Sequence, residues 1–272
     1  MQHKTKGYTM KKTIIAVGGG SYGQIKTYPD GRQVQKNKDS IEIDKEMIKL
    51  TGKEHPKIVF IGAAHGDDES RFLVIKKYFS DDFGCEVENL NLVDDSKRPS
   101  ADNIKKIILW ADIIYVGGGN VTYLMNILKK TGVDNLLIQA YNQGIIMAGN
   151  SAGGCVWFEY YGNDEDDDFD GTFDTFKPKK ALGLVHGYFE PHWNEKPEEG
   201  IDKDAVSRNA VQRMLARESK FGYGVDEGAA IMVQTDDNNN QTITEIISKP
   251  GAKIYKLLEP KHQYIHAGKG RE

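Results

Sequence analysis

Short β-branched apolar runs alternate with longer amphipathic segments through the first half of the chain, and this alternation restricts the fold more than any other feature. The runs predict strands at 13–17, 57–61, 86–90 and 112–116. Apolar residues at helical spacing predict helices at 41–50, 70–79, 101–110 and 121–130. Strands that alternate with helices form a mostly parallel sheet with right-handed crossovers and with helices on both faces. The sequence therefore predicts a doubly wound α/β fold.

Small residues follow several of the predicted strands. Glycine or alanine occupies positions 18–20 and 62–64, three glycines stand at 117–119, and a fourth apolar run ends at Ser151. Because sites in such sheets lie at the carboxyl ends of the strands, we expect these loops to meet in one crevice.

The C-terminal third predicts further strands and the end of the domain. A polar turn at 236–240 joins the apolar runs 229–234 and 242–247, which indicates a β-hairpin at the edge of the sheet, and 181–185 predicts another strand. With 272 residues, 39% of them hydrophobic, the chain is large enough for one α/β domain with a substantial core. We expect this domain at 13–258, with loose ends at 1–12 and 259–272.

Charge and cysteine content narrow the class of partner. A net charge of -4 argues against a general nucleic-acid or membrane-surface binder and favours a small molecule or peptide. Cys85 and Cys155 are far apart and encode neither a disulfide framework nor a zinc site. The run at 13–17 is too short for the core of an export signal. These features predict a cytoplasmic protein without a cofactor.

The segment 145–154, Ile-Ile-Met-Ala-Gly-Asn-Ser-Ala-Gly-Gly, is typical of a nucleophile elbow. A buried strand ends, the chain turns at Ser151, and a helix begins at Ala152, while Gly149 and Gly153 allow close packing. An alternative interpretation is a glycine-rich connection in a nucleotide-binding sheet, with Ser151 as an ordinary helix cap.

A nucleophilic serine requires a base and an oxyanion hole. Of the histidines that could reach a central crevice, His65, His186 and His192, the last follows the predicted strand 181–185 on a loop, where a general base is expected. The glycines at 117–119, with the amide of Ala152, could bind the oxyanion. The alternative, a phosphate cradle, lacks the Gly-Lys-Ser/Thr that would follow it.

The acidic loop at 163–170 offers many carboxylates to orient the histidine, and the choice among them stays open. Most of its members are expected to be solvated. Its alternating aspartates are similar to part of a calcium loop, but the required glycine and glutamate are misplaced, so no metal site is predicted.

Three motifs together resemble the peptidase E family, which includes aspartyl dipeptidases and cyanophycinases with a fold similar to the class I glutamine amidotransferases. They are Gly-Asn-Ser-Ala-Gly at 149–153, Tyr-Val-Gly-Gly-Gly-Asn at 115–120 and Pro-His at 191–192. The resemblance extends from about 13 to about 233. It implies a serine hydrolase that requires no metal. Homodimers are common in that family, and the oligomeric state of this chain stays open.

The resemblance also implies roles for individual residues. Ser151 matches the nucleophile and His192 the base, while the amides of Gly118 or Gly119 and of Ala152 match the oxyanion hole. The orienting acid matches Asp164 first, with Asp168 and Asp170 in reserve and Glu159 as another alternative.

Substrate-binding residues follow from the same resemblance. Arg208 matches an arginine that recognises an acidic substrate, although an ordinary exposed helix arginine is an equal interpretation. Asn120 and Glu227 are expected at the rim of the site. The chain departs from the family pattern in two places. Glu190 brings a negative charge close to the base in sequence, and the sequence indicates no role for the polar insertion 22–39.

The sequence thus favours a serine peptidase for small peptides, including dipeptides that begin with aspartate. The competing hypothesis is a catalytically silent protein that binds an anionic metabolite on the same fold. Glutamine amidotransfer would require a cysteine at the elbow, where this chain has Ser151.

Overall fold

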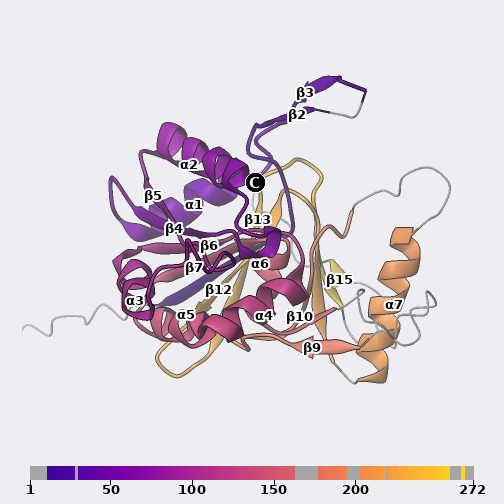
Figure 1. Ribbon diagram of the computed structural model, residues 1–272. Helices are drawn as coiled ribbons and strands as arrows, with labels where there is room; N and C mark the ends of the chain where they lie inside the picture. Colours follow the sequence, from indigo (N-terminus) through magenta and orange to yellow (C-terminus); the bar gives the residue numbers. More distant parts are fainter. Residues whose placement is uncertain are drawn as a thin grey trace, which may run out of the picture.

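Two β-sheets form the framework of the protein in the computed structural model (Figure 1). The structure describes residues 11–27, 30–162, 177–194, 203–218, 220–257 and 265–266. The predicted loose ends at 1–12 and 259–272 therefore lie almost wholly outside the described residues.

The larger sheet has seven strands in the order β13-β12-β1-β7-β6-β4-β5. Their bounds are β1 Lys12–Val17, β4 Lys57–Ile61, β5 Glu86–Asn89, β6 Ile113–Val116, β7 Ile146–Asn150, β12 Ala229–Thr235 and β13 Gln241–Ile247. The strands from β1 to β5 in this order run parallel, whereas β12 and β13 form an antiparallel hairpin at one edge. The predicted α/β fold and its C-terminal hairpin are confirmed.

Helices cover both faces of this sheet. Along β1, Ile14 and Ala16 pack into one buried cluster, whereas Ile15 and Val17 pack into another, as the period of two along a strand requires. Helices α1 and α2 cover one face and α3, α4 and α5 the other (Figure 1). The helices are α1 Ile41–Thr51, α2 Glu69–Phe83, α3 Ala101–Trp110, α4 Val121–Thr131 and α5 Val133–Asn142.

Side chains at the helix starts explain where several of these helices begin. The Asp68, Ser100 and Asn120 side chains accept hydrogen bonds from the backbone N–H groups of the first turns of α2, α3 and α4. Helix α5 was not predicted. It follows α4 after Gly132 alone, which acts as the end of one helix and the start of the next.

A second sheet of six strands, in the order β15-β14-β11-β10-β8-β9, was not predicted. Its bounds are β8 Phe158–Gly162, β9 Pro178–Lys180, β10 Val185–Glu190, β11 Gly222–Val225, β14 Ile254–Leu257 and β15 Ile265–His266. The predicted strand at 181–185 is wrong in position. The amides of 181–184 instead donate to carbonyl groups of 156–159, and the strand begins only at Val185.

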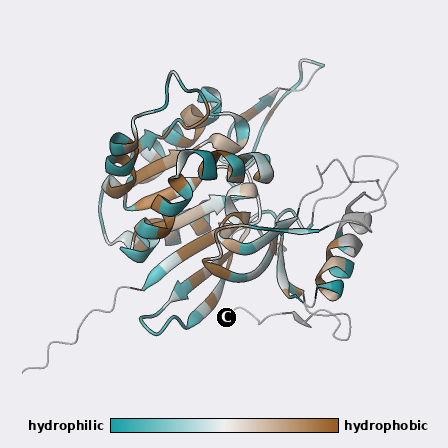
Figure 2. Ribbon diagram, turned by 60° about the horizontal axis from the view of Figure 1, so that its bottom comes forward, coloured by the Kyte–Doolittle hydropathy of each residue, from teal (hydrophilic) through white to brown (hydrophobic). Residues whose placement is uncertain are grey.

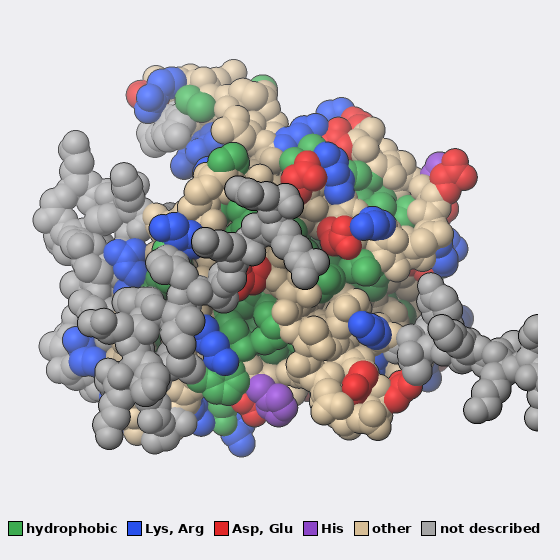
Figure 3. All heavy atoms as spheres, turned by 180° about the vertical axis from the view of Figure 1, so that it is seen from behind, with side chains coloured by type: hydrophobic (Ala, Val, Ile, Leu, Met, Phe, Trp, Pro, Cys, Tyr) green, Lys and Arg blue, Asp and Glu red, His purple; other side chains and the backbone are tan. Residues whose placement is uncertain are grey.

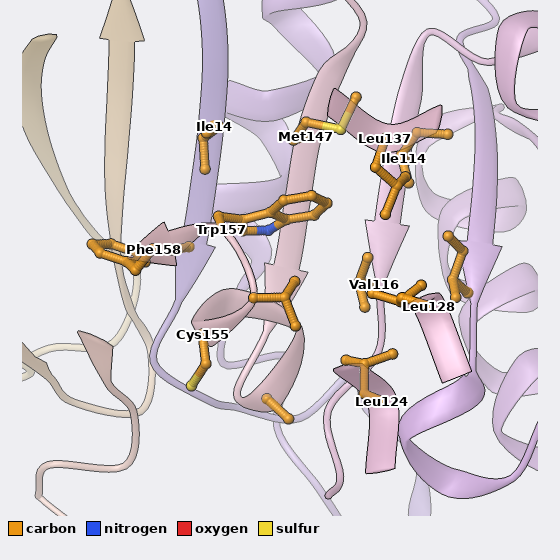
Figure 4. Close-up of a cluster of buried hydrophobic side chains, with 14 of the residues drawn as sticks. Ile14, Ile114, Val116, Leu124, Leu128, Leu137, Met147, Cys155, Trp157 and Phe158 are labelled. Carbon is orange, nitrogen blue, oxygen red and sulfur yellow. The ribbon is translucent and has the colours of Figure 1, made fainter. Parts of the chain in front are cut away.

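The two sheets share one core. Trp157 is fully buried in the cluster that contains Ile14 and Met147 of the larger sheet, and it lies between these side chains in Figure 4. The neighbouring Phe158 stacks on Phe189 of the second sheet, with ring centroids 5.0 Å apart. Helix α7 (Lys203–Arg217) packs Val211, Met214 and Leu215 against the opposite face of that sheet.

Figure 2 shows hydrophobic residues concentrated in the strands between the layers, with hydrophilic residues on the outer turns of the helices. In the part of the chain that the structure describes, no helix is long and apolar enough to cross a membrane.

Candidate active site

The turn at Ser151 joins β7 to a short helix, α6 (Ala152–Cys155), as the sequence predicts. Ser151 has a positive φ of 56° with ψ at -120°, an unfavourable conformation for a residue with a Cβ. Its amide donates to Val17 O at 2.9 Å, and its carbonyl accepts from Gly154 N at 2.7 Å. These bonds hold the strained turn in place.

Close backbone packing at the elbow depends on glycine. A Cβ atom at Gly149 would lie 2.0 Å from the Gly153 carbonyl oxygen, and one at Gly153 would lie 2.0 Å from the Val116 carbonyl oxygen. The first turn of α6 can therefore lie directly on β7 and β6 only because both positions lack a side chain.

His192 lies beside the serine. Its Nε2 is 2.8 Å from Ser151 Oγ, a hydrogen-bond distance. The residue follows β10, and its backbone is fixed by a 2.7 Å hydrogen bond from its amide to Gly18 O. Ser151 comes from the larger sheet and His192 from the second sheet, so the two groups meet where the sheets adjoin.

Glu227 occupies the other side of the imidazole. Its Oε1 lies 3.1 Å from His192 Nδ1, and its own amide donates to Asn194 Oδ1. The hydrogen bond with His192 lowers the pKa of Glu227 below its usual range, despite partial burial, which acts in the opposite direction. The sequence interpretation had placed this residue at the substrate rim. The structure instead places its carboxylate in contact with the histidine.

Asp164, the acid favoured by the sequence, lies outside the described residues, as do Asp168 and Asp170. Glu159 is described and does not face His192. Its carboxylate accepts from Gly187 N at 2.8 Å and lies near His186. Sequence reasoning missed the position of Glu227 because the segment 224–228 gives no local sign that β11 lies beside β10.

The glycine loop after β6 lies against the serine. A Cβ atom at Gly118 would lie 3.0 Å from Ser151 Cβ and 3.6 Å from Ser151 Oγ. The adjacent Gly119 has a φ of 142° and packs on the Ala64 carbonyl. The backbone of this loop therefore lies beside the Ser151 hydroxyl.

A cleft of about 760 Å³ contains Ser151 and His192. All four predicted small-residue loops reach it, through Gly20, Gly62, Gly117–Gly119 and Ser151. One wall is formed by the insertion around β2 (Ile25–Thr27) and β3 (Gln33–Gln35), and the other by the start of α2. Lys26, Lys36 and Arg71 line the cleft, and Asp68 is the carboxylate among the lining residues.

The remaining predicted residues lie elsewhere. Arg208 donates from Nη1 to Trp193 O at 2.8 Å, and Asn120 Oδ1 caps α4 by accepting from Tyr123 N at 2.7 Å. Neither residue lines the cleft. Glu190 accepts a hydrogen bond from the Tyr188 hydroxyl and is likewise absent from the cleft wall.

The described residues contain no group of three or more His, Cys, Asp or Glu side chains arranged to hold a metal ion. The acidic loop at 163–170 is not part of the described structure.

Comparison with known proteins identifies the family. The sequence pattern of "Peptidase family S51" matches residues 31–241, which is more than half of the chain. The chain belongs to peptidase family S51. A Bacillus subtilis (strain 168) protein named "Uncharacterized peptidase YgaJ" is 29% identical to this S51 peptidase over 260 residues, covering 93% of this chain and 94% of the relative.

A second relative in sequence and one solved structure are also similar to this chain. The Listeria monocytogenes (serovar 1/2a) protein named "Uncharacterized peptidase Lmo0363" is 29% identical over 159 residues, covering 58% of this S51 chain and 76% of the relative. A crystal structure of a peptidase from an acI-B1 Actinobacterium has the same fold, with a TM-score of 0.66 at 20% identity and 96% coverage of both chains.

Proposed function

We propose that this S51 peptidase is a serine peptidase that cleaves small peptides through an acyl-enzyme on Ser151. The observation that carries the proposal is the 2.8 Å distance between His192 Nε2 and Ser151 Oγ at the floor of an open cleft. A serine hydroxyl becomes a useful nucleophile when a base at this distance can accept its proton.

In the proposed acylation step, His192 Nε2 takes the proton from Ser151 Oγ while the oxygen attacks the peptide carbonyl carbon. The amides of Gly118, Gly119 and Ala152 stabilise the resulting oxyanion. His192 then gives the proton to the leaving nitrogen, the C–N bond breaks, and an ester on Ser151 remains. Water, deprotonated by His192, attacks this ester; His192 returns the proton to Ser151 Oγ as the C–O bond breaks and the acid is released.

We assign the third catalytic role to Glu227. The 3.1 Å distance to His192 Nδ1 supports it, because a carboxylate there accepts the Nδ1–H, fixes the tautomer and stabilises the imidazolium. The lowered pKa of Glu227 keeps this carboxylate ionised throughout the neutral range.

For the substrate, we propose peptides that carry an acidic residue, with N-terminal aspartate as the first choice. The support is the charge of the cleft, whose lining among the described residues includes Lys26, Lys36 and Arg71 but only one carboxylate, Asp68. Because Arg208 is turned toward the Trp193 carbonyl, Arg71 replaces it as the candidate partner of the acidic side chain.

A fluorophosphonate probe tests the serine mechanism. It should label the wild type and the control Ser70→Ala, which removes another hydroxyl of the same cleft, but not Ser151→Ala. Labelling that persists in Ser151→Ala contradicts the proposal, and no labelling of either protein contradicts it and favours the silent binding protein. Hydrolysis of Asp-Leu, compared with Ala-Leu, then tests the preference for aspartate.

A further inference from the structure

The polar insertion forms an arm that projects from the body of the molecule. We define the arm as residues 22–38, which comprise the antiparallel pair β2 and β3 and a bridge between Tyr22 and Lys38 (Figures 1 and 2). Six of its described residues line the cleft that holds Ser151: Tyr22, Gln24, Ile25, Lys26, Thr27 and Lys36. The arm is therefore part of the site and not a separate appendage.

The base of the arm is fixed to the floor of the site. The Tyr22 hydroxyl lies 2.6 Å from the Tyr115 hydroxyl and accepts from Asn150 Nδ2 at 3.1 Å. Asn150 directly precedes Ser151, and the Tyr22 ring also contacts Tyr78 with centroids 5.3 Å apart. These contacts place the arm at a defined position relative to the nucleophile.

The chain enters the arm from the histidine side of the serine. A Cβ atom at Gly19, just before the arm, would lie 2.6 Å from the His192 ring and 3.0 Å from Glu227 Cγ. The charge of Lys36 is close enough to Glu227 to help lower the pKa of that carboxyl. The Ala64 carbonyl packs on Gly119, in the glycine loop that lies against Ser151.

This arrangement assigns the two ends of the cleft to different halves of a peptide. The leaving nitrogen must receive its proton from His192 Nε2, so the residue that carries this nitrogen extends toward the histidine side. In a dipeptide that residue bears the free α-carboxylate. On the arm, Lys36 is half-buried in the wall of the cleft, and Ile25 has an apolar side chain that is 59% exposed. Figure 3 shows basic side chains on the projecting arm at the upper left.

We propose that the arm is the subsite for the residue released as the amine, and that Lys36 binds the free α-carboxylate of that residue. Ile25 packs against its side chain. This inference rests on the proposed peptidase function and adds a substrate class to it: short peptides whose leaving residue is the C-terminal one. The Lys36 ammonium group donates a charge-assisted hydrogen bond to this carboxylate.

The test compares Asp-Leu with Asp-Leu amide, which differ only in the terminal carboxylate. We expect kcat/KM to favour Asp-Leu by about tenfold in the wild type, which corresponds to one charge-assisted contact in a partly exposed site. The ratio should fall to about one in Lys36→Met and persist in Lys36→Arg. Arg32→Met, which removes a positive charge from the same arm outside the cleft lining, should keep the wild-type ratio.

Binding to Ser151→Ala protein, measured by calorimetry, separates this inference from the peptidase proposal. Here too Asp-Leu should bind about tenfold more tightly than its amide, and adding Lys36→Met should remove the difference. Equal binding of both peptides overturns the arm subsite even if hydrolysis is observed. A clear binding preference without hydrolysis by the wild type overturns the peptidase proposal and leaves only the carboxylate contact of Lys36 standing. An equal loss on both substrates in Lys36→Met assigns Lys36 to the electrostatics of the triad and overturns the inference.

Discussion

Replacing Glu227 by glutamine tests the proposed triad most directly. The change keeps the size of the side chain and removes the charge 3.1 Å from His192 Nδ1. Both side chains are about one-third exposed (32% for His192 and 35% for Glu227), so water screens their attraction. With charge centres about 4 Å apart and an effective dielectric constant of about 20 to 40, the imidazolium loses about 2 to 4 kcal/mol. We expect kcat to fall by roughly 30-fold to 1,000-fold.

The assay is steady-state hydrolysis of Asp-Leu near neutral pH, with circular dichroism to confirm that the variant folds. Glu159→Gln is the matched control, because Glu159 contacts Gly187 N and not His192. Asp164→Asn tests the acid favoured by the sequence. A near-normal kcat in Glu227→Gln, or a larger loss in Asp164→Asn, would refute the assignment of Glu227.

Three predictions concern stability, each measured by urea unfolding. Gly149→Ala should cost about 3 kcal/mol or more, because its Cβ would lie 2.0 Å from the Gly153 carbonyl oxygen; a near-wild-type midpoint contradicts this. Trp157→Ala should cost about 3 to 5 kcal/mol through the cavity it leaves in the shared core, and a loss below about 1 kcal/mol contradicts it. Burial raises the pKa of Asp44 to about 7 from its usual 3.8, so the folded state binds the extra proton. The free energy of unfolding should therefore fall by up to about 4 kcal/mol as pH rises from about 4 to about 7. Asp44→Asn should remove this pH dependence, and an unchanged dependence contradicts the prediction.

Much of the larger sheet could be predicted because its strands and helices carry local signals. The run at β1 is apolar on both faces, and side chains such as Ser100 and Asn120 mark the first turns of their helices. The second sheet lacks such signals. Strand β11 reads Gly-Tyr-Gly-Val, and β10 carries a glycine and a histidine, so neither shows a clean apolar period.

The candidate site also has one part that local sequence signals predict and another part that they do not. Ser151 and His192 could be expected to meet, because an elbow and a histidine on a later strand-end loop are recognisable along the sequence. The contact of Glu227 with His192 depends on the parallel pairing of β10 with β11, which is a non-local property. The acid predicted from the sequence, in the acidic loop at 163–170, lies outside the described residues and stays a prediction. The proposed role of the arm likewise depends on its position beside the cleft, which is a non-local property.

The proposed nucleophile and base belong to separate layers, since Ser151 follows a strand of the larger sheet and His192 and Glu227 follow strands of the second. The relative position of the Ser151 hydroxyl and the His192 imidazole therefore depends on how the two sheets pack against each other. A partly denatured molecule could retain its secondary structure in both layers and still be inert. In a urea titration, turnover should therefore be lost at a lower urea concentration than the far-UV circular dichroism signal. Activity would then report the loss of tertiary packing before the loss of secondary structure.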